Sequence, residues 1–144
     1  MKQDVDDVYG RAAEGALPLF DEGPFSHSPI DPEPVEKVVA GLIWQRDRVR
    51  PIAIREITAA TGMSERAVKE TVEQLRTAHR CAIGAARQEP FGYFWIRSAE
   101  DREIAVRPYR EQIFTMLRTL RVLDSPAALR EFLGQLRLEV EREV

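Results

Sequence analysis

The sequence predicts a mainly helical α+β protein, in which a helix-turn-helix is followed by a β-hairpin and by a C-terminal helical hairpin. Apolar residues recur at helical spacing on both sides of Gly62, which predicts two helices joined by a short turn. A segment dense in aromatic and β-branched residues follows, as expected of strands. Two further helical stripes are separated by a break at Ser125 and Pro126. A chain of 144 residues has room for one compact unit with appendages.

Residues 1–33 are predicted to form an irregular acidic arm that contains proline and glycine. They show no sustained helical or strand period, and their net charge is −6. Residues 34–97 carry a net charge of +4 and residues 98–144 carry −1, within an overall charge of −3. The middle of the chain is therefore its basic part, and the negative overall charge does not exclude a nucleic-acid partner.

The first helix is expected to run from Pro34 to near Arg46. Proline suits the first helical position because its missing N–H would have no partner there. One face of this helix carries an apolar stripe made of Val35, Val38, Val39, Leu42 and Ile43. Pro51 disfavours helical geometry in the residue before it, so the chain is expected to turn and then to extend over residues 52–54.

The second helix is expected to end at Gly62, where a left-handed residue closes a helix. Ser64 supplies the N-cap of a third helix, whose buried face is made of Ala67, Val68, Thr71, Val72 and Leu75. Residues 81–85 and residues 91–96 are predicted to be strands, joined by a turn over residues 87–90. A hairpin directly after a helix-turn-helix is a wing, so residues 34–97 predict a winged helix-turn-helix domain.

The run from Arg55 to Leu75, REITAATGMSERAVKETVEQL, is followed by Ile83 and then by Gly92 and Tyr93. This order resembles the N-terminal winged-helix domain of biotin repressor-type bacterial regulators. The shared features are an isoleucine before the turn glycine, a serine cap, valine and leucine on the third helix, and Gly-Tyr on the returning strand. The resemblance covers about 60 of the 144 residues. It departs from the family pattern at Thr58, where alanine is usual, and it does not extend to the ligase domain of biotin repressors.

Residues 98–144 are predicted to form a helical extension. A heptad seam is made of Val106, Tyr109, Ile113, Met116, Leu120 and Leu123. Another stripe, after a cap at Ser125 and a first-turn proline, is made of Leu129, Phe132, Leu133, Leu136 and Val140. Two antiparallel helices are expected. They either close the core of one chain or pair two chains in a homodimer, with the six seam residues as the interface.

We expect the chain to bind duplex DNA and to act as a regulator of transcription or of a mobile element. The expected base contacts, on the outward face of the third helix, are Ser64, Glu65, Arg66, Lys69 and Glu70. The expected phosphate contacts, near the second helix and around the hairpin, are Arg46, Arg48, Arg50, Arg55, Arg80 and Arg87. Acidic residues on the third helix would repel phosphates, so a merely solvated helix face is the alternative. The alternative function is a winged-helix adaptor between proteins in a replication or segregation complex.

No enzymatic activity, cofactor or metal site is predicted. His79 and Cys81 are two residues apart, but a metal site needs three or four ligands, and His27 lies in the distant arm. Cys81 is instead expected to be a small buried apolar residue. This single cysteine, together with the absence of a basic and then apolar leader after Met1, predicts a cytoplasmic protein. No apolar run approaches the roughly 18 residues of a membrane span.

The arm contains one distinctive string, EGALPLF, which ends at Phe20. Its apolar residues Leu17, Leu19 and Phe20 resemble the peptides by which bacterial replication and repair proteins dock on the sliding clamp. Those peptides usually begin with glutamine, where this chain has Glu14. The alternative is that the three side chains pack on the core of the same chain.

Overall fold

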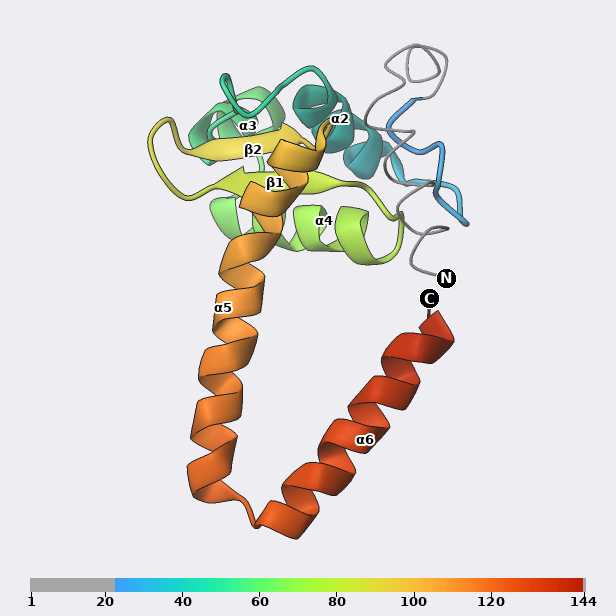
Figure 1. Ribbon diagram of the computed structural model, residues 1–144. Helices are drawn as coiled ribbons and strands as arrows, with labels where there is room; N and C mark the ends of the chain where they lie inside the picture. Colours follow the sequence, from blue (N-terminus) through green and yellow to red (C-terminus); the bar gives the residue numbers. More distant parts are fainter. Residues whose placement is uncertain (1–22, 144) are drawn as a thin grey trace. The chain divides into compact units, whose positions relative to one another are not determined.

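The structure is a computed structural model that describes residues 23–143 (Figure 1). Its elements are α2 (Pro34–Trp44), α3 (Ile54–Thr61), α4 (Glu65–Thr77), β1 (Ile83–Ala86), β2 (Gly92–Trp95), α5 (Ala99–Leu123) and α6 (Pro126–Glu143). The described part is therefore mostly helical with a small two-stranded antiparallel sheet, as the sequence predicts. The clamp-like residues Leu17, Leu19 and Phe20 lie outside the described residues.

Helix α2 begins at Pro34, as predicted, and the backbone N–H of Glu33 donates to the Glu36 carboxylate at 2.8 Å. Its buried residues are Val39, Ala40 and Ile43. Two residues of the predicted apolar stripe, Val35 and Val38, are 41% and 52% exposed. Helices α3 and α4 and strand β2 pack against α2, and its buried residues span a narrower arc than the apolar stripe.

The turn between α3 and α4 has the predicted caps. Gly62 adopts a left-handed conformation with φ of 75°, and its N–H donates to the carbonyl of Thr58 at 2.8 Å. The hydroxyl of Ser64 accepts from the N–H of Ala67 at 3.1 Å. These local bonds satisfy backbone groups that a helix end leaves without partners, and they fix the first turn of α4 next to the end of α3.

The hairpin is joined to the segment between α2 and α3 by an isolated antiparallel bridge between Ile52 and Tyr93. Each residue donates its N–H to the carbonyl of the other at 2.8 Å. Glycine is needed beside this bridge, because a Cβ on Gly92 would lie 2.4 Å from the carbonyl oxygen of Ile52, and its φ is +151°. The short extended piece predicted at residues 52–54 is therefore a strand-like contact that ties the hairpin to the helices.

The two strands are shorter than predicted. Strand β1 starts at Ile83 rather than at Cys81, because the N–H of Cys81 still donates to the carbonyl of Leu75 at the end of α4, at 2.9 Å. Strand β2 covers residues 92–95 rather than 91–96. In the register of the pair, Gly84 faces Phe94, and a Cβ on Gly84 would lie 2.5 Å from the Phe94 ring. The aromatic ring therefore covers the space that glycine leaves open.

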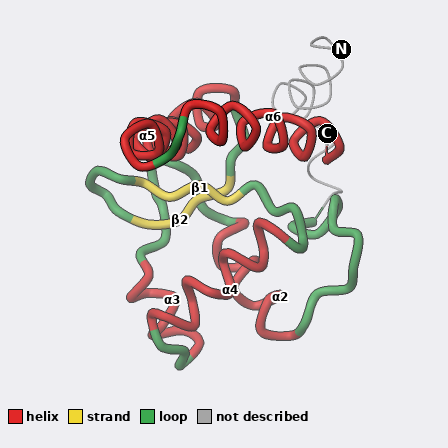
Figure 2. Tube along the Cα trace, turned by 90° about the horizontal axis from the view of Figure 1, so that it is seen from below, coloured by secondary structure: helices red, strands yellow, loops and turns green. Residues whose placement is uncertain are grey.

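Helices α2, α3 and α4 lie together on one side of the hairpin (Figure 2). Between them and the hairpin lies the core, which is made of Val39, Ala40, Ile43, Ile52, Ile57, Val68, Val72, Leu75, Cys81, Ile83 and Trp95. Side chains alternate along a strand, so Phe94 faces away from this core, yet it is fully buried. Ala105 is the buried residue of α5.

The chain divides into a unit that ends at Val106 and a second unit that begins at Arg107. The break between α5 and α6 is as predicted: α6 begins at Pro126, and the Ser125 hydroxyl accepts from the N–H of Ala128 at 3.1 Å. Within the described part of residues 107–144 no side chain is buried. Whether these helices close the core of one chain or pair two chains stays a prediction.

The Gly92→Ala substitution tests the bridge to Ile52. We expect it to lower the free energy of unfolding by about 2 kcal/mol or more, because the new methyl group and the Ile52 carbonyl cannot occupy the same space. Gly41→Ala is the matched control, since nothing lies within 4 Å of that Cβ position on α2, and it is expected to gain about 0.5–1 kcal/mol. Urea unfolding measures both changes. Equal stabilities of the two variants would contradict the role of the bridge.

Candidate nucleic-acid interface

Helix α4 presents the residues predicted to contact bases. Ser64 caps the helix, and Glu65, Arg66, Lys69 and Glu70 are all exposed. Arg66 Nε lies 3.1 Å from a carboxylate oxygen of Glu70, with side chains 89% and 67% exposed. An exposed pair at this helical spacing is worth only about 0.3–0.5 kcal/mol, so Arg66 can leave Glu70 for another acceptor.

The two flanks of α4 differ in charge. On the flank beside α2, a cleft of about 500 Å³ is lined by Glu33, Val35, Glu36, Ala67, Glu70, Thr71, Glu73 and Gln74. On the opposite flank, Arg76 donates to the carbonyl of Ile83 at 2.9 Å and lies 6.0 Å from the Tyr93 ring centroid. Lys69 is seven residues before Arg76 and so lies on the same face of the helix. Glu65 lies on this face too, four residues before Lys69, so the flank toward the hairpin carries two cations and one carboxylate. The charged residues that line the cleft toward α2 are all acidic.

Several predicted phosphate contacts are exposed cations without an ion pair. Arg50 lies in the α2–α3 loop, Arg55 in the first turn of α3, Arg80 after α4, and Arg87 in the turn between the strands. Within the part of the chain that the structure describes, none of these four side chains forms an ion pair. Arg80 adopts a positive φ of 56° at the point where the chain leaves α4. These four arginines can bind an anion without first losing an internal partner.

The two remaining predicted phosphate contacts have internal partners. Arg46 lies 3.6 Å from a carboxylate oxygen of Glu56. Arg48 contacts Asp101 at 3.1 Å and Glu100 at 3.4 Å, and its side chain is 34% exposed. The first pair joins the loop after α2 to α3, and the pairs of Arg48 join that loop to the start of α5. Arg48 is therefore engaged in holding the fold together.

Sequence reasoning missed Arg97. Its guanidinium donates to the carbonyl of Arg46 at 2.9 Å and to the carbonyl of Trp44, and it lies 5.1 Å from the Trp44 ring centroid. Burial lowers the pKa of Arg97, and the negative charges of Asp47 and Asp101 oppose this shift. A cation here satisfies carbonyls at the C-terminal end of α2, where the helix dipole is negative. An arginine two residues after the end of a strand carries no sequence signal for such a contact.

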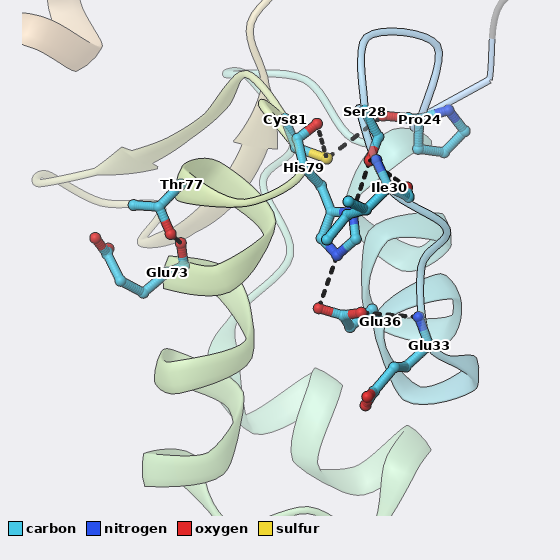
Figure 3. A network of polar contacts seen from close by, with 9 residues as sticks. All are labelled: Pro24, Ser28, Ile30, Glu33, Glu36, Glu73, Thr77, His79 and Cys81. Carbon is cyan, nitrogen blue, oxygen red and sulfur yellow. Dashed lines mark hydrogen bonds and ion pairs between the residues drawn. The ribbon is translucent and has the colours of Figure 1, made fainter. Parts of the chain in front are cut away.

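A second missed feature is a buried polar network around His79 (Figure 3). His79 is 2% exposed, and its Nδ1 lies 2.8 Å from the Ser28 hydroxyl, while its Nε2 lies 3.0 Å from a carboxylate oxygen of Glu36. The ring of Phe25 packs edge-on against the imidazole, and the two ring centroids are 5.4 Å apart. The network therefore ties the segment before α2 to the end of α4, which is a structural role for this histidine.

Cys81 is buried, as predicted, and its Sγ lies 3.4 Å from the carbonyl oxygen of Pro24. Burial raises the pKa of the Cys81 thiol to about 12, and the negative charge of Glu36 acts in the same direction. A thiol in this environment is protonated at neutral pH, which does not favour nucleophilic attack or metal binding. Among the described residues, no group of three or more histidine, cysteine, aspartate or glutamate side chains is arranged to hold a metal ion.

Comparison of the chain with protein-family models, with curated proteins and with solved structures found no match. Among the described residues, no helix is both long enough and apolar enough to span a membrane.

Alkylation of the thiol tests the environment of Cys81. At about pH 8 we expect iodoacetamide to modify the unfolded chain readily and the folded chain very slowly, because burial shields the thiol and disfavours its reactive thiolate form. The folded pKa lies above the unfolded one, so stability is retained below about pH 9 and falls as the pH rises toward 12. Cys81→Ala should remove this alkaline loss. Equal alkylation rates for folded and unfolded protein would contradict the assignment.

Proposed function

We propose that residues 34–97 form a winged helix-turn-helix domain that binds duplex DNA, and that the protein regulates transcription or a mobile element. The observation that carries the proposal is the order of elements together with the Ile52–Tyr93 bridge. A helix, a short strand-like segment, two helices joined by a capped turn, and a hairpin paired with that first segment make up the winged-helix arrangement. In this proposal α4 is the recognition helix, and the loop between β1 and β2 is the wing.

The proposed contact surface combines the hairpin-side flank of α4 with the wing. Lys69 is an exposed cation on that flank, and Arg87 is an exposed cation at the tip of the wing. A helix in the major groove brings its N-terminal residues to the base edges, and an adjacent loop reaches the phosphates. Arg66 would donate to a guanine after leaving Glu70. Arg50 and Arg55 add exposed positive charge near the start of α3.

The acidic flank of α4 restricts how DNA approaches. Glu33, Glu36, Glu70 and Glu73 line the cleft between α2 and α4, and a phosphate near them would be repelled. DNA is therefore expected to approach from the hairpin side. On α4 itself the charges are only partly separated, because Arg66 lies 3.1 Å from Glu70 and Arg76 lies 3.9 Å from Glu73.

A second candidate function is an adaptor that binds proteins, and the same cleft favours it. Val35 and Val38 are 41% and 52% exposed on α2, and Val35 lines the acidic cleft. Exposed apolar groups beside carboxylates suit a basic segment of another protein in a replication or segregation complex. The two candidate functions use opposite flanks of α4, so substitutions on one flank distinguish them.

Fluorescence anisotropy with a labelled random-sequence duplex tests DNA binding by the full chain. We expect affinity to fall as salt rises, and each of Lys69→Ala and Arg87→Ala to reduce the slope of log affinity against log salt by about 0.9. Lys37→Ala is the matched control, because Lys37 is an exposed lysine on α2 and lies outside the proposed surface. It should leave the slope nearly unchanged.

Three outcomes of this titration would contradict DNA binding through α4 and the wing. Two are the absence of salt-dependent binding and equal losses for Lys69→Ala and Lys37→Ala. The third is undiminished DNA binding by Lys69→Ala and Arg87→Ala. If the unmodified chain fails to bind duplex DNA but binds a lysine-rich peptide, and Glu70→Gln with Glu73→Gln abolishes that binding, the adaptor function is the correct one.

A further inference from the structure

We propose that residues 107–144 associate with the same segment of a second copy of this chain, so that two helical hairpins form a four-helix bundle. The first observation is exposed apolar surface. Within the described part of this segment no side chain is buried, and the exposed large apolar side chains are Tyr109, Ile113, Phe114, Met116, Val122, Leu123, Phe132, Leu133, Leu136, Leu138 and Val140. Helices in water depend on tertiary packing for most of their stability, so this segment lacks the partner that would stabilise it.

The amount of exposed apolar surface is appropriate for a stable dimer. Eight of these side chains, all except Phe114, Val122 and Leu138, belong to the two predicted apolar stripes. At their exposed fractions they present on the order of 800 Å² of surface, against about 800 Å² per partner in a standard interface. Among them, the exposed fraction is 78% at Leu123 and 59% at Met116. Apolar surface of this extent is larger than a soluble monomer ordinarily leaves exposed.

The spacing of these residues indicates four helices rather than two. On α5 the seam of Tyr109, Ile113, Met116, Leu120 and Leu123 alternates steps of four and three residues, and on α6 Leu129, Leu133, Leu136 and Val140 do the same. Each seam has an additional apolar neighbour, Leu117 on α5 and Phe132 on α6. The wider face allows each helix to contact two others, as in a four-helix bundle, whereas a two-stranded coiled coil needs only the narrow seam.

The connection and the charges fit two copies of the same segment. Only Asp124 and Ser125 separate the two helices, and a loop this short makes helices of one chain antiparallel neighbours in a bundle. Residues 107–123 carry a net charge of +3, and α6 (Pro126–Glu143) carries −1. A two-fold axis would place the basic helix of each copy beside the acidic helix of the other, so the surface is complementary to itself. The proposal is independent of DNA binding.

The molecular mass of the full chain in solution tests this proposal. Sedimentation equilibrium from about 1 to about 100 µM should give twice the chain mass of 16.4 kDa at the upper concentrations. Ile113→Asp on α5 and Leu136→Asp on α6 place a charge in each seam, and each should weaken dimerisation at least tenfold. Val122→Asp and Leu138→Asp are matched controls, because these exposed residues lie on the same two helices but outside the seams. Both controls should remain dimeric.

The proposal is overturned if the unmodified chain is a monomer, a trimer or a larger assembly over this range. It is also overturned if the off-seam controls dissociate as readily as the seam variants. Helical content measured by circular dichroism should rise with protein concentration, since association stabilises α5 and α6. The fluorescence of Trp44 and Trp95 reports on the first unit, so a seam variant that lost this signal would be excluded as unfolded.

Discussion

The backbone bridge between Ile52 and Tyr93 is the constraint on which the arrangement of the first unit depends. The bridge holds the hairpin against the segment between α2 and α3, and the caps at Gly62 and Ser64 hold α4 against α3. The position of the hairpin loop relative to α4 therefore follows from hydrogen bonds within the fold. The bridge is possible because residue 92 is a glycine. The Ile52 carbonyl occupies the space that a Cβ at this position would take. The surface proposed to contact DNA depends on this local geometry.

The arginines divide into two groups with different roles. Arg48 and Arg97 converge on Asp101: Arg48 Nε donates to one carboxylate oxygen and the backbone N–H of Arg97 donates to the other, each at 3.1 Å. They join the end of α2, the loop after it and the start of α5. Arg55 and Arg87, in contrast, extend from the fold as exposed cations. A structural arginine has a fixed carbonyl or carboxylate partner, whereas an arginine that binds an external anion must be free of one.

Local sequence signals predicted the helix boundaries well, and tertiary features were predicted less well. Gly62 and Ser64 act within a few residues of themselves, so their roles follow from the sequence alone. The exposure of Val35 depends on which side of α2 the other elements cover, and apolar spacing does not contain that information. For the same reason, the charge difference between the two flanks of α4 and the role of Arg97 become visible only once the hairpin and α2 are in place. The pairing of His79 with Ser28, which is 51 residues away, has no local signal at all.

Amide hydrogen exchange of the full chain, with and without saturating duplex DNA, locates the surface that contacts DNA. We expect DNA to slow exchange in the first turns of α4, over residues 64–70, and in the hairpin loop, over residues 86–91. We expect no change in α6, which lies in the other unit. Protection confined to residues 107–143, or no protection anywhere under conditions in which the duplex is bound, would contradict the assignment of α4 and the hairpin as the surface that contacts DNA.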